Sequence, residues 1–363
     1  MQILEYFQNQ RHTSTPFIPR KCQLPPTGNL NLYGPRGSGK TAIIFDYMEE
    51  TEAEKTLYID LDDPNLIFTP LLVASLQRHI DAEGITLLIL DHYRAGYFET
   101  LPKVARLIVL SRTPLHDADL IKVALFPLDY EEFLAFETTT ANKSFNHFLR
   151  LGTLPAVARS PKSHTEIFKH FFQSAFSESE QKLLLILAQH HTKHLTTHQI
   201  YSFAKEKFKV SKDWLYKTIK TFEEEKLLFF IEDRYQKSGK KMLLFDFAFA
   251  KYLTLGQPFS IQFDTMIALA FIKHQIAFET LGIHGYLTLS NELVIPAPFE
   301  SEESLWVKSQ NKFSIYKKYG IQKVTIVTIA NSYEYQIEKL HFEAIPFNEW
   351  SVINAEEELV VSG

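Results

Sequence analysis

The chain has 363 residues, and its 38 basic and 43 acidic side chains give a formal net charge of −5. At about 100–200 residues per domain this length predicts two or three domains, and the 45% hydrophobic and 13% aromatic content excludes a disordered chain. The lone Cys22 excludes an internal disulfide, and residues 1–10 lack a signal-peptide profile. Apolar runs such as Met266–Ile272 are too short to span a membrane. We therefore expect a cytoplasmic protein.

The first half of the sequence alternates short apolar runs with helical patterns, which indicates an α/β fold with a parallel sheet covered on both faces. Five strands are predicted, at Leu30–Tyr33, Thr56–Ile59, Thr86–Leu90, Leu107–Leu110 and Ile121–Leu125. Helices are expected between them, at Lys40–Glu49, at Pro64–His79 and, as a short piece, at Phe98–Ala105. Five strands with these connections are typical of a compact nucleotide-binding core.

A glycine-rich loop follows the first predicted strand and matches the phosphate-binding pattern G-x-x-x-x-G-K-[ST]. Its candidate ligand residues are Gly34, Pro35, Arg36, Gly37, Ser38, Gly39, Lys40 and Thr41. The glycines allow backbone N–H groups to face phosphates, Lys40 would contact the β- and γ-phosphates, and the Thr41 hydroxyl would bind Mg²⁺. The loop therefore predicts ATP or ADP, with Mg²⁺, as cofactors.

An acidic residue ends the third predicted strand. The buried run Ile85–Leu90 leads to Asp91, which is the Walker B arrangement and would hold Mg²⁺ together with Thr41. The next residue is His92, where active ATPases of this class usually carry a glutamate that polarises the attacking water. Since imidazole is a poor substitute for that carboxylate, we expect slow or absent hydrolysis, unless a base comes from elsewhere.

Polar residues after the other strands are further candidates. Ser111 ends the fourth strand, which in five-stranded P-loop sheets lies between the P-loop strand and the Asp91 strand. Ser111 could therefore sense the γ-phosphate, or it could be a simple turn residue, and Arg112 could contact phosphate in this chain or in a neighbour. Asp62 and Asp63 could supply a base, although a turn-forming acidic pair is the favoured interpretation.

The middle of the chain, residues 177–256, carries 14 basic and 10 acidic side chains. Three helices followed by a β-hairpin predict a winged helix. The helices are expected to begin at the capping box of Ser177 and Glu180, at Thr197 and at Ser211, and the hairpin strands are expected at Leu227–Glu232 and Lys241–Phe245.

Basic residues of this segment make duplex DNA a candidate partner. They are Lys212, Lys217 and Lys220 on the third helix and Lys237, Lys240 and Lys241 at the wing. The alternative is that the winged helix packs on the core as a rigid lid, and Glu223, Glu224 and Glu225 would repel DNA. For His191, His194 and His198 a solvated turn is favoured over a metal site, because no cysteine or nearby carboxylate completes a ligand set.

The sequence resembles AAA+/STAND-related ATPases of bacteria and archaea that combine a P-loop domain, a winged helix and a C-terminal nuclease-like domain. The stretches that carry the resemblance are Gly34–Thr41, Tyr58–Pro64, Ile89–Asp91, Phe126–Leu134 and Gly152–Pro155. The resemblance implies an ATPase core that uses ATP and Mg²⁺. It also implies that Gly152–Pro155 is the family's Gly-Gly-x-Pro turn near the nucleotide. Two residues depart from the family pattern, His92 at the acid position and Thr153 at the second turn glycine.

The last part of the chain is expected to form a small α/β domain. Helices are predicted at Ile261–Ile276 and Lys312–Tyr319, and strands at Tyr286–Leu289, Leu293–Ile295, Leu305–Lys308 and Val324–Ile329. This order suggests the PD-(D/E)xK nuclease arrangement with Lys308 as its lysine. Because Trp306 and Val294 occupy the two acid positions, although Glu292 is near, we expect a degenerate domain that serves interaction or regulation.

We therefore predict three domains, at residues 1–176, 177–256 and 257–363, with net charges of −3, +4 and −6. The first is a P-loop ATPase domain with a helical lid region. The predicted function is an ATP-binding, nucleotide-dependent switch with slow hydrolysis and a candidate protein partner for the C-terminal domain. The alternatives are a DNA-binding regulatory protein whose nucleotide is mainly structural, and a Mg²⁺-dependent nuclease.

Overall fold

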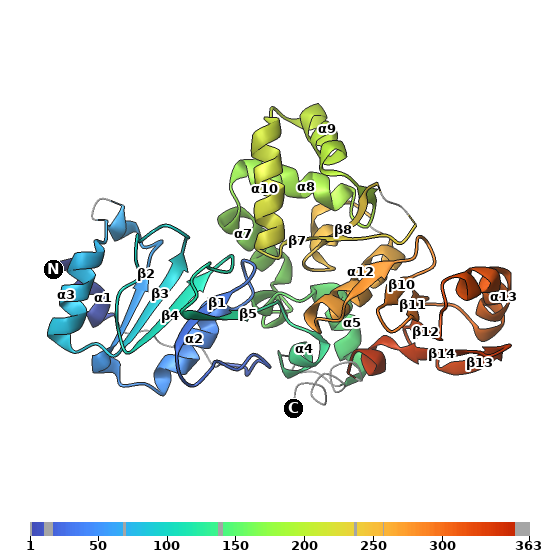
Figure 1. Cartoon of the computed structure of the whole chain (residues 1–363), viewed down its shortest axis with the longest axis horizontal. Coiled ribbons are helices and arrows are strands. Elements are labelled where there is room, and N and C mark those ends of the chain that lie inside the picture. Colours follow the sequence, from blue (N-terminus) through green and yellow to red (C-terminus); the bar gives the residue numbers. More distant parts are fainter. Residues whose placement is uncertain are drawn as a thin grey trace. The chain divides into compact units, whose positions relative to one another are not determined.

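The computed structural model describes residues 2–10, 17–67, 70–136, 141–235, 238–256 and 258–352. The chain divides into two compact units (Figure 1). The first unit comprises Met1–Pro127 and Glu224–Leu227, and the second comprises Leu128–Glu223 and Leu228–Gly363. Within the described residues, no helix combines the length and the apolar character that a membrane crossing requires.

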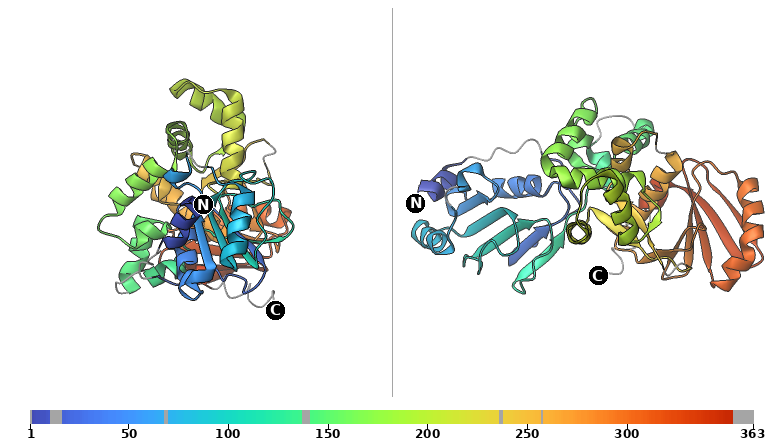
Figure 2. Two further views of the ribbon diagram at one scale, coloured as in Figure 1. Left: turned by 90° about the vertical axis from the view of Figure 1, so that its left-hand side faces the viewer. Right: turned by 90° about the horizontal axis from the view of Figure 1, so that it is seen from above.

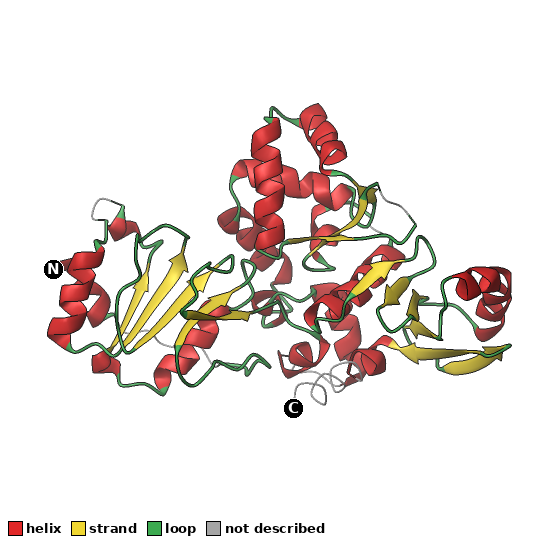
Figure 3. Ribbon diagram, viewed as in Figure 1, coloured by secondary structure: helices red, strands yellow, loops and turns green. Residues whose placement is uncertain are grey.

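The first unit contains a five-stranded sheet with strand order β2-β3-β4-β1-β5 (Figure 3). Its strands are β1 (Asn29–Tyr33), β2 (Thr56–Asp60), β3 (Leu87–Tyr93), β4 (Arg106–Ser111) and β5 (Leu120–Ala124). All four neighbouring pairs are parallel. The predicted parallel sheet is confirmed, and so is the placement of the fourth strand between the P-loop strand and the Asp91 strand.

Helices cover both faces of this sheet (Figures 1 and 2). They are α1 (Gln2–Asn9), α2 (Lys40–Glu49) and α3 (Val73–Glu83), with short 3₁₀ turns at Ala53–Lys55 and Pro64–Leu66. Since side chains alternate along a strand, Leu57 of β2 packs in one cluster with residues of α1 and α3. Tyr58 points to the other face and packs in a second cluster with residues of α2.

Three expectations for this unit need correction or addition. The helix predicted at Pro64–His79 is a 3₁₀ turn followed, after Pro70, by α3 from Val73, because proline cannot continue a helix. The short helix predicted at Phe98–Ala105 is wrong: the segment is irregular and contains Pro102. Helix α1 was not predicted, and its apolar Leu4 and Phe7 are buried.

The second unit begins with helices whose contacts explain two of the resemblance stretches. The helices are α4 (Tyr130–Phe136), α5 (Ala141–Leu151), α6 (Pro155–Ala158) and α7 (His164–Ala175). Asp129 and Glu132 cap α4 reciprocally, since each side chain accepts from the other's backbone N–H. The N–H of Leu128 donates to the carbonyl of Thr153 over 2.8 Å, which joins the Phe126–Leu134 stretch to the Gly152–Pro155 turn.

A buried carboxylate explains the composition of this turn. Asp246 is 2% exposed and accepts from the N–H and the hydroxyl of Thr153, and from the N–H groups of Ala248 and Phe249 over 2.8 Å each. A Cβ at Gly152, where φ is +80°, would lie 2.7 Å from both carboxylate oxygens. The second residue of the turn, Thr153, therefore serves as a hydrogen-bond donor to Asp246.

The three helices and the two hairpin strands expected for a winged helix follow, together with one strand and one helix that were not predicted. They are α8 (Glu178–Gln189), β6 (His194–Leu195), α9 (Thr197–Lys207), α10 (Lys212–Glu224), β7 (Leu228–Ile231), β8 (Lys240–Leu244) and α11 (Phe249–Leu253). The strands form an antiparallel sheet with order β6-β8-β7. The capping box is confirmed, since Ser177 accepts from the Glu180 N–H and Glu180 accepts from the Ser177 N–H.

The last part of the chain has one long helix, a six-stranded mixed sheet with order β13-β14-β12-β11-β10-β9, and a second long helix. The elements are α12 (Phe259–Lys273), β9 (Phe278–Thr280), β10 (Tyr286–Thr288), β11 (Glu292–Pro296), α13 (Glu302–Lys318), β12 (Lys323–Thr328), β13 (Tyr333–Ile337) and β14 (Leu340–Pro346). The lid helices and these elements belong to one unit, and the domain boundaries at 176 and 256 stay a prediction.

The strand predicted at Leu305–Lys308 is wrong, because these residues lie in α13. Ser301 caps this helix by accepting from the Ser304 N–H, and acidic residues fill its first turn. Trp306 is 40% exposed on the helix, and the Lys308 ammonium pairs with Glu300 over 2.5 Å. Glu292 lies on β11, where it accepts a hydrogen bond from Thr325. The lysine assigned to nuclease chemistry is therefore not on a strand of the sheet.

Candidate functional site

The P-loop connects β1 to α2 at the carboxyl edge of the first unit's sheet. Gly34 has φ +155°, and a Cβ there would lie 2.1 Å from the carbonyl oxygen of Leu125, so only glycine fits. Gly39 occupies the N-cap of α2 with φ +96° and offers no side chain to the first N–H groups of the helix. These amide groups are therefore left for an anion, as phosphate binding at a helix N-terminus requires.

Lys40 folds back over its own loop. Its ammonium donates to the carbonyls of Gly34 over 2.8 Å and Pro35 over 3.0 Å. Burial lowers the pKa of Lys40 to about 8, against the opposing charge of Asp91, so the lysine is more easily neutralised than an exposed one. A bound phosphate would restore the preference for the charged ammonium.

The two predicted Mg²⁺ ligands lie side by side. The Thr41 hydroxyl donates to Oδ2 of Asp91 over 2.7 Å, and Asp91 is 2% exposed. The hydroxyl of Tyr58 donates to the same oxygen over 2.8 Å, and burial, followed by the charge of Asp91, raises the pKa of Tyr58 far above its usual value. Tyr58 thus remains a donor that holds Asp91 in place, a role that the sequence analysis missed.

His92 lies directly after Asp91 in a strained backbone conformation. Its φ is +55°, which is uncommon for a residue other than glycine, at a point where the pairing of β3 with β4 shifts register. Its N–H donates to Oδ1 of Asp91 over 2.7 Å. Its ring nitrogen Nδ1 lies 2.7 Å from Oδ1 of Asp60, and this hydrogen bond raises the pKa of His92.

Asp60 reaches His92 because β2 and β3 are neighbours in register, with Asp60 opposite Asp91. The two acidic residues considered as substitute bases are engaged elsewhere. Asp62 pairs with Arg94 over 2.7 Å, and Asp63 caps the turn at Pro64 by accepting from the Asn65 N–H over 2.8 Å. These contacts agree with the turn-forming interpretation of the pair.

Ser111 lies at the carboxyl end of β4 in a buried polar network. Its hydroxyl donates to the carbonyl of Thr113 over 2.6 Å and accepts from the amide of Asn31 over 2.8 Å. Asn31, which is fully buried on β1, also donates to the Val109 carbonyl and accepts from the N–H of Leu115. Ser111 therefore stabilises its own turn, and its role as a phosphate sensor stays a prediction.

The remaining P-loop side chains differ in their contacts. Arg20 donates to the carbonyls of Ser38 and Phe126 over 2.9 Å each, which fixes the loop to the segment after β5. The Arg36 guanidinium is buried and contacts the carboxylate of Glu225, of the same unit, over 3.1 Å. The hydroxyl of Ser38 is buried without a hydrogen-bond partner among the described residues. An orphaned hydroxyl beside open helix N–H groups and Lys40 fits a nucleotide phosphate.

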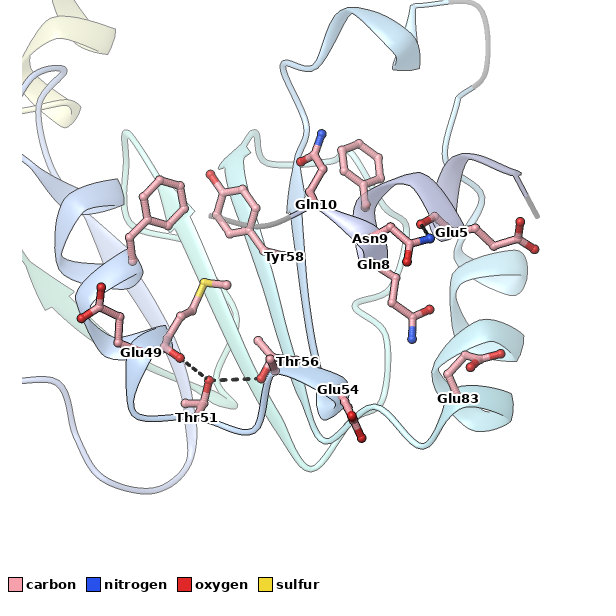
Figure 4. Close-up of a pocket in the computed structure, with 14 residues that line it drawn as sticks. Glu5, Gln8, Asn9, Gln10, Glu49, Thr51, Glu54, Thr56, Tyr58 and Glu83 are labelled. Carbon is pink, nitrogen blue, oxygen red and sulfur yellow. Dashed lines mark hydrogen bonds between the residues drawn. The ribbon is translucent and has the colours of Figure 1, made fainter. Parts of the chain in front are cut away.

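A groove of about 1010 Å³ lies elsewhere on the first unit, lined by parts of α1, α2, α3 and β2 (Figure 4). It includes Thr56, the first residue of β2, so it is centred at the amino end of that strand, whereas Asp60 and the P-loop lie at carboxyl ends. Tyr58 lines this groove, and its hydroxyl also donates a hydrogen bond to Asp91, so Tyr58 lies between the groove and the P-loop site.

The lysines predicted to contact DNA fall into two groups. Lys212, Lys217 and Lys220 are exposed on α10. Lys240 pairs with Glu232 over 2.5 Å, while Lys241 is largely buried, with its ammonium 2.6 Å from Asp264 and 2.8 Å from the Tyr286 hydroxyl. The contacts of Lys241 argue against its prediction as a phosphate-binding cation, and Lys237 lies outside the described residues.

The three histidines near α8 do not form a solvated turn as expected. His191 is 3% exposed and bonded to Thr265, and His194 lies 3.4 Å from Asp233, whereas His198 is exposed. Within the described ranges, no group of three His, Cys, Asp or Glu residues is placed to hold a metal ion. The solvated environment predicted for these histidines is wrong for His191.

Comparison with known proteins bears on the P-loop region. Residues 27–95 match the family described as an AAA domain, and this stretch contains β1, the P-loop, α2, β2 and the Asp91 strand. This segment is therefore similar to an AAA domain, and this similarity supports a nucleotide-binding P-loop protein. Among solved structures, the Walker-type ATPase PABY2304 of Pyrococcus abyssi is similar, with 12% identity, a TM-score of 0.44, and coverage of 63% of this chain and 92% of that chain. None of the curated proteins matches the chain.

Proposed function

We propose that the protein is an ATP-binding switch in which a P-loop domain binds Mg²⁺ and ATP or ADP and hydrolyses ATP slowly. The observation that carries the proposal is the 2.7 Å hydrogen bond between the Thr41 hydroxyl, at the end of the P-loop, and the Asp91 carboxylate. When bound, Mg²⁺ would neutralise phosphate charge. Thr41 and Asp91 would hold the ion, the amides of Gly34–Thr41 and the Ser38 hydroxyl would bind phosphate, and Lys40 would turn from its loop carbonyls to the nucleotide.

Slow hydrolysis is supported by the surroundings of His92. A general base must have a free lone pair to accept a proton from water. The hydrogen bond to Asp60 raises the pKa of His92, so a larger fraction of the ring is protonated near neutral pH. Slow hydrolysis suits a switch, because the ATP-bound state then persists. While ATP is bound, its contacts can favour one conformation of the protein over another.

Replacing Lys40 with alanine tests nucleotide binding. We expect the dissociation constants for ATP and ADP, measured by calorimetry with Mg²⁺, to rise at least about tenfold, because a buried charge-assisted contact with phosphate is lost. Lys55→Ala is the matched control, since Lys55 is exposed and paired with Glu52 at the other end of the unit. If the wild-type protein binds neither nucleotide, the proposed function is wrong.

A DNA-binding regulatory role is the second candidate, favoured by the exposed lysines of α10 in a segment with net charge +4. The element order α8-β6-α9-α10-β7-β8 supports the proposal of a winged helix in which α10 would be the recognition helix. We expect the variant Lys212→Gln/Lys217→Gln/Lys220→Gln to bind duplex DNA at least about threefold more weakly and with a shallower salt dependence. Fluorescence anisotropy at several salt concentrations measures both quantities. Lys182→Gln is the control, since Lys182 pairs with Glu178 on α8 and is outside the predicted DNA-binding set. Equal affinity of the triple variant would exclude this role.

A further inference from the structure

A short segment that follows α10 and leads to β7 belongs to the first unit and carries a buried carboxylate. The segment is Glu224–Leu227. The sequence suggests one acidic patch at Glu223, Glu224 and Glu225, yet the first two are exposed, whereas Glu225 is 3% exposed. The next residue, Lys226, has φ +61°, which is uncommon for a residue other than glycine. The chain therefore leaves α10 by a turn that keeps Glu225 buried.

The partner of this carboxylate is a residue of the P-loop. Nε of Arg36 donates to Oε2 of Glu225 over 3.1 Å, and Nη2 of Arg36 donates to Oε1 over 3.3 Å. Both side chains are withdrawn from water, with 8% of the Arg36 side chain and 5% of the Glu225 side chain exposed. A guanidinium offers the same two parallel donors to a phosphate group. Glu225 therefore occupies donors that a nucleotide phosphate could use.

The charge of Glu225 also acts on the other cations near the P-loop. Burial lowers the pKa of Lys40 to about 8, and the charges of Asp91 and Glu225 act against this lowering. Burial, followed by the charge of Arg36, lowers the pKa of Arg112, and Glu225 opposes that change too. One carboxylate thus offsets part of the positive charge that would attract a phosphate. Where little water screens the charges, it also repels a phosphate strongly.

We propose that the Glu225 carboxylate is autoinhibitory, because it competes with a nucleotide phosphate for Arg36 and so lowers the affinity of the P-loop for ATP and ADP. The inference rests on the proposed function and adds its regulation. Since Glu224–Leu227 connects α10 to β7 along the chain, a nucleotide that displaces Glu225 also releases this connection. The switch then has a contact that is made in one state and broken in the other, as a ligand needs to shift a conformational equilibrium.

Glu225→Gln tests the proposal, because glutamine keeps the size and one acceptor oxygen of glutamate but removes the charge. ADP and a non-hydrolysable ATP analogue with an imido bridge are each titrated with Mg²⁺ in a calorimeter. We expect both dissociation constants to fall about fivefold or more, since a neutral side chain is more easily displaced from Arg36 and does not repel phosphate. A purely structural ion pair predicts the opposite, because breaking a buried pair would disturb the P-loop.

Glu224→Gln is the matched control, since it removes the same charge from the neighbouring, exposed residue. It should bind both nucleotides with the wild-type affinities. Unchanged or weaker binding by Glu225→Gln overturns the role of Glu225, while nucleotide binding by the wild-type protein stands. If the wild-type protein binds neither nucleotide, the proposed function fails and the role of Glu225 fails with it.

Glu225→Asp decides if Glu225→Gln does not fold. Aspartate keeps the charge but is one methylene shorter, so its carboxylate is drawn back from Arg36 and leaves the guanidinium more accessible to phosphate. We expect both dissociation constants to fall about threefold, less than in Glu225→Gln because the negative charge remains. Wild-type affinities in Glu225→Asp would then overturn the proposal.

Discussion

Replacing His92 with glutamate is expected to raise the rate of ATP hydrolysis about tenfold to a hundredfold, because a positioned carboxylate base contributes at least that much to such reactions. In the wild-type protein the hydrogen bond between the imidazole and Asp60 raises the pKa of His92, so a larger fraction of the ring is protonated and has no lone pair to accept a proton from water. The new carboxylate would follow Asp91 directly.

Asp60 limits this gain. A glutamate at position 92 would place a second negative charge beside the Asp60 carboxylate, which now lies 2.7 Å from the histidine ring. We therefore expect His92→Glu/Asp60→Asn to hydrolyse ATP faster than His92→Glu alone. Single-turnover and steady-state phosphate release measure both rates.

The control for added charge is His116→Glu, since His116 is exposed in the loop between β4 and β5. This variant should hydrolyse ATP at the wild-type rate. Robust turnover by the wild-type protein, equal to that of His92→Glu, would show that His92 does not limit hydrolysis. The switch with slow hydrolysis would then be wrong, although nucleotide binding would be unaffected by that result.

Local patterns in the sequence predicted the P-loop unit well. Helix α2 has the predicted bounds, Lys40 to Glu49, because a glycine-rich loop before it and a polar segment after it mark both ends. The apolar runs of the five strands are equally clear, since both faces of the sheet are buried. The failures have local causes too. Leu305–Lys308 is rich in apolar residues like a strand, yet Ser301 and the acidic residues after it cap a helix there.

The sequence predicted site residues only where they belong to a recognisable motif. Thr41 and Asp91 each belong to a motif, and their contact follows from the order of the strands. The contacts of Tyr58 and Asp60 with the Asp91 region depend on the register between β2 and β3, which no sequence pattern specifies. Asn31 looked like an ordinary strand residue, and only the neighbouring β4 shows that its amide holds the turn that carries Arg112.

The second unit is expected to lose stability in mild acid because of His191. Its Nδ1 accepts from the N–H of Leu244 over 3.3 Å, and its Nε2 lies 2.7 Å from the Thr265 hydroxyl, which itself donates to the Ile261 carbonyl. Nε2 must therefore carry the proton and Nδ1 the lone pair, so the contacts fit only the neutral ring. Burial, followed by the charge of Lys241, lowers the pKa of His191 to about 3.

The sign of the effect follows from the lowered pKa. The unfolded chain binds a proton at His191 below its ordinary pKa of 6.5, whereas the folded chain does not until about 3. The contribution of neutral His191 to the free energy of unfolding is thus complete above pH 6.5. Below pH 6.5 this contribution falls by about 1.4 kcal/mol for each pH unit. At about pH 4.5 the free energy of unfolding should be lower by about 3 kcal/mol from this residue alone.

Urea unfolding at several pH values, followed by circular dichroism, measures this slope. Other groups also titrate in this range, so the informative quantity is the difference between variants. His191→Gln should be less stable than the wild-type protein near pH 7, because it loses the ring's packing and bonds, and should have the shallower pH dependence. His198→Gln removes an exposed histidine from the same region and should keep the wild-type slope. Equal slopes in His191→Gln and the wild-type protein would mean that His191 has the same pKa in the folded and unfolded chains, and the prediction would be wrong.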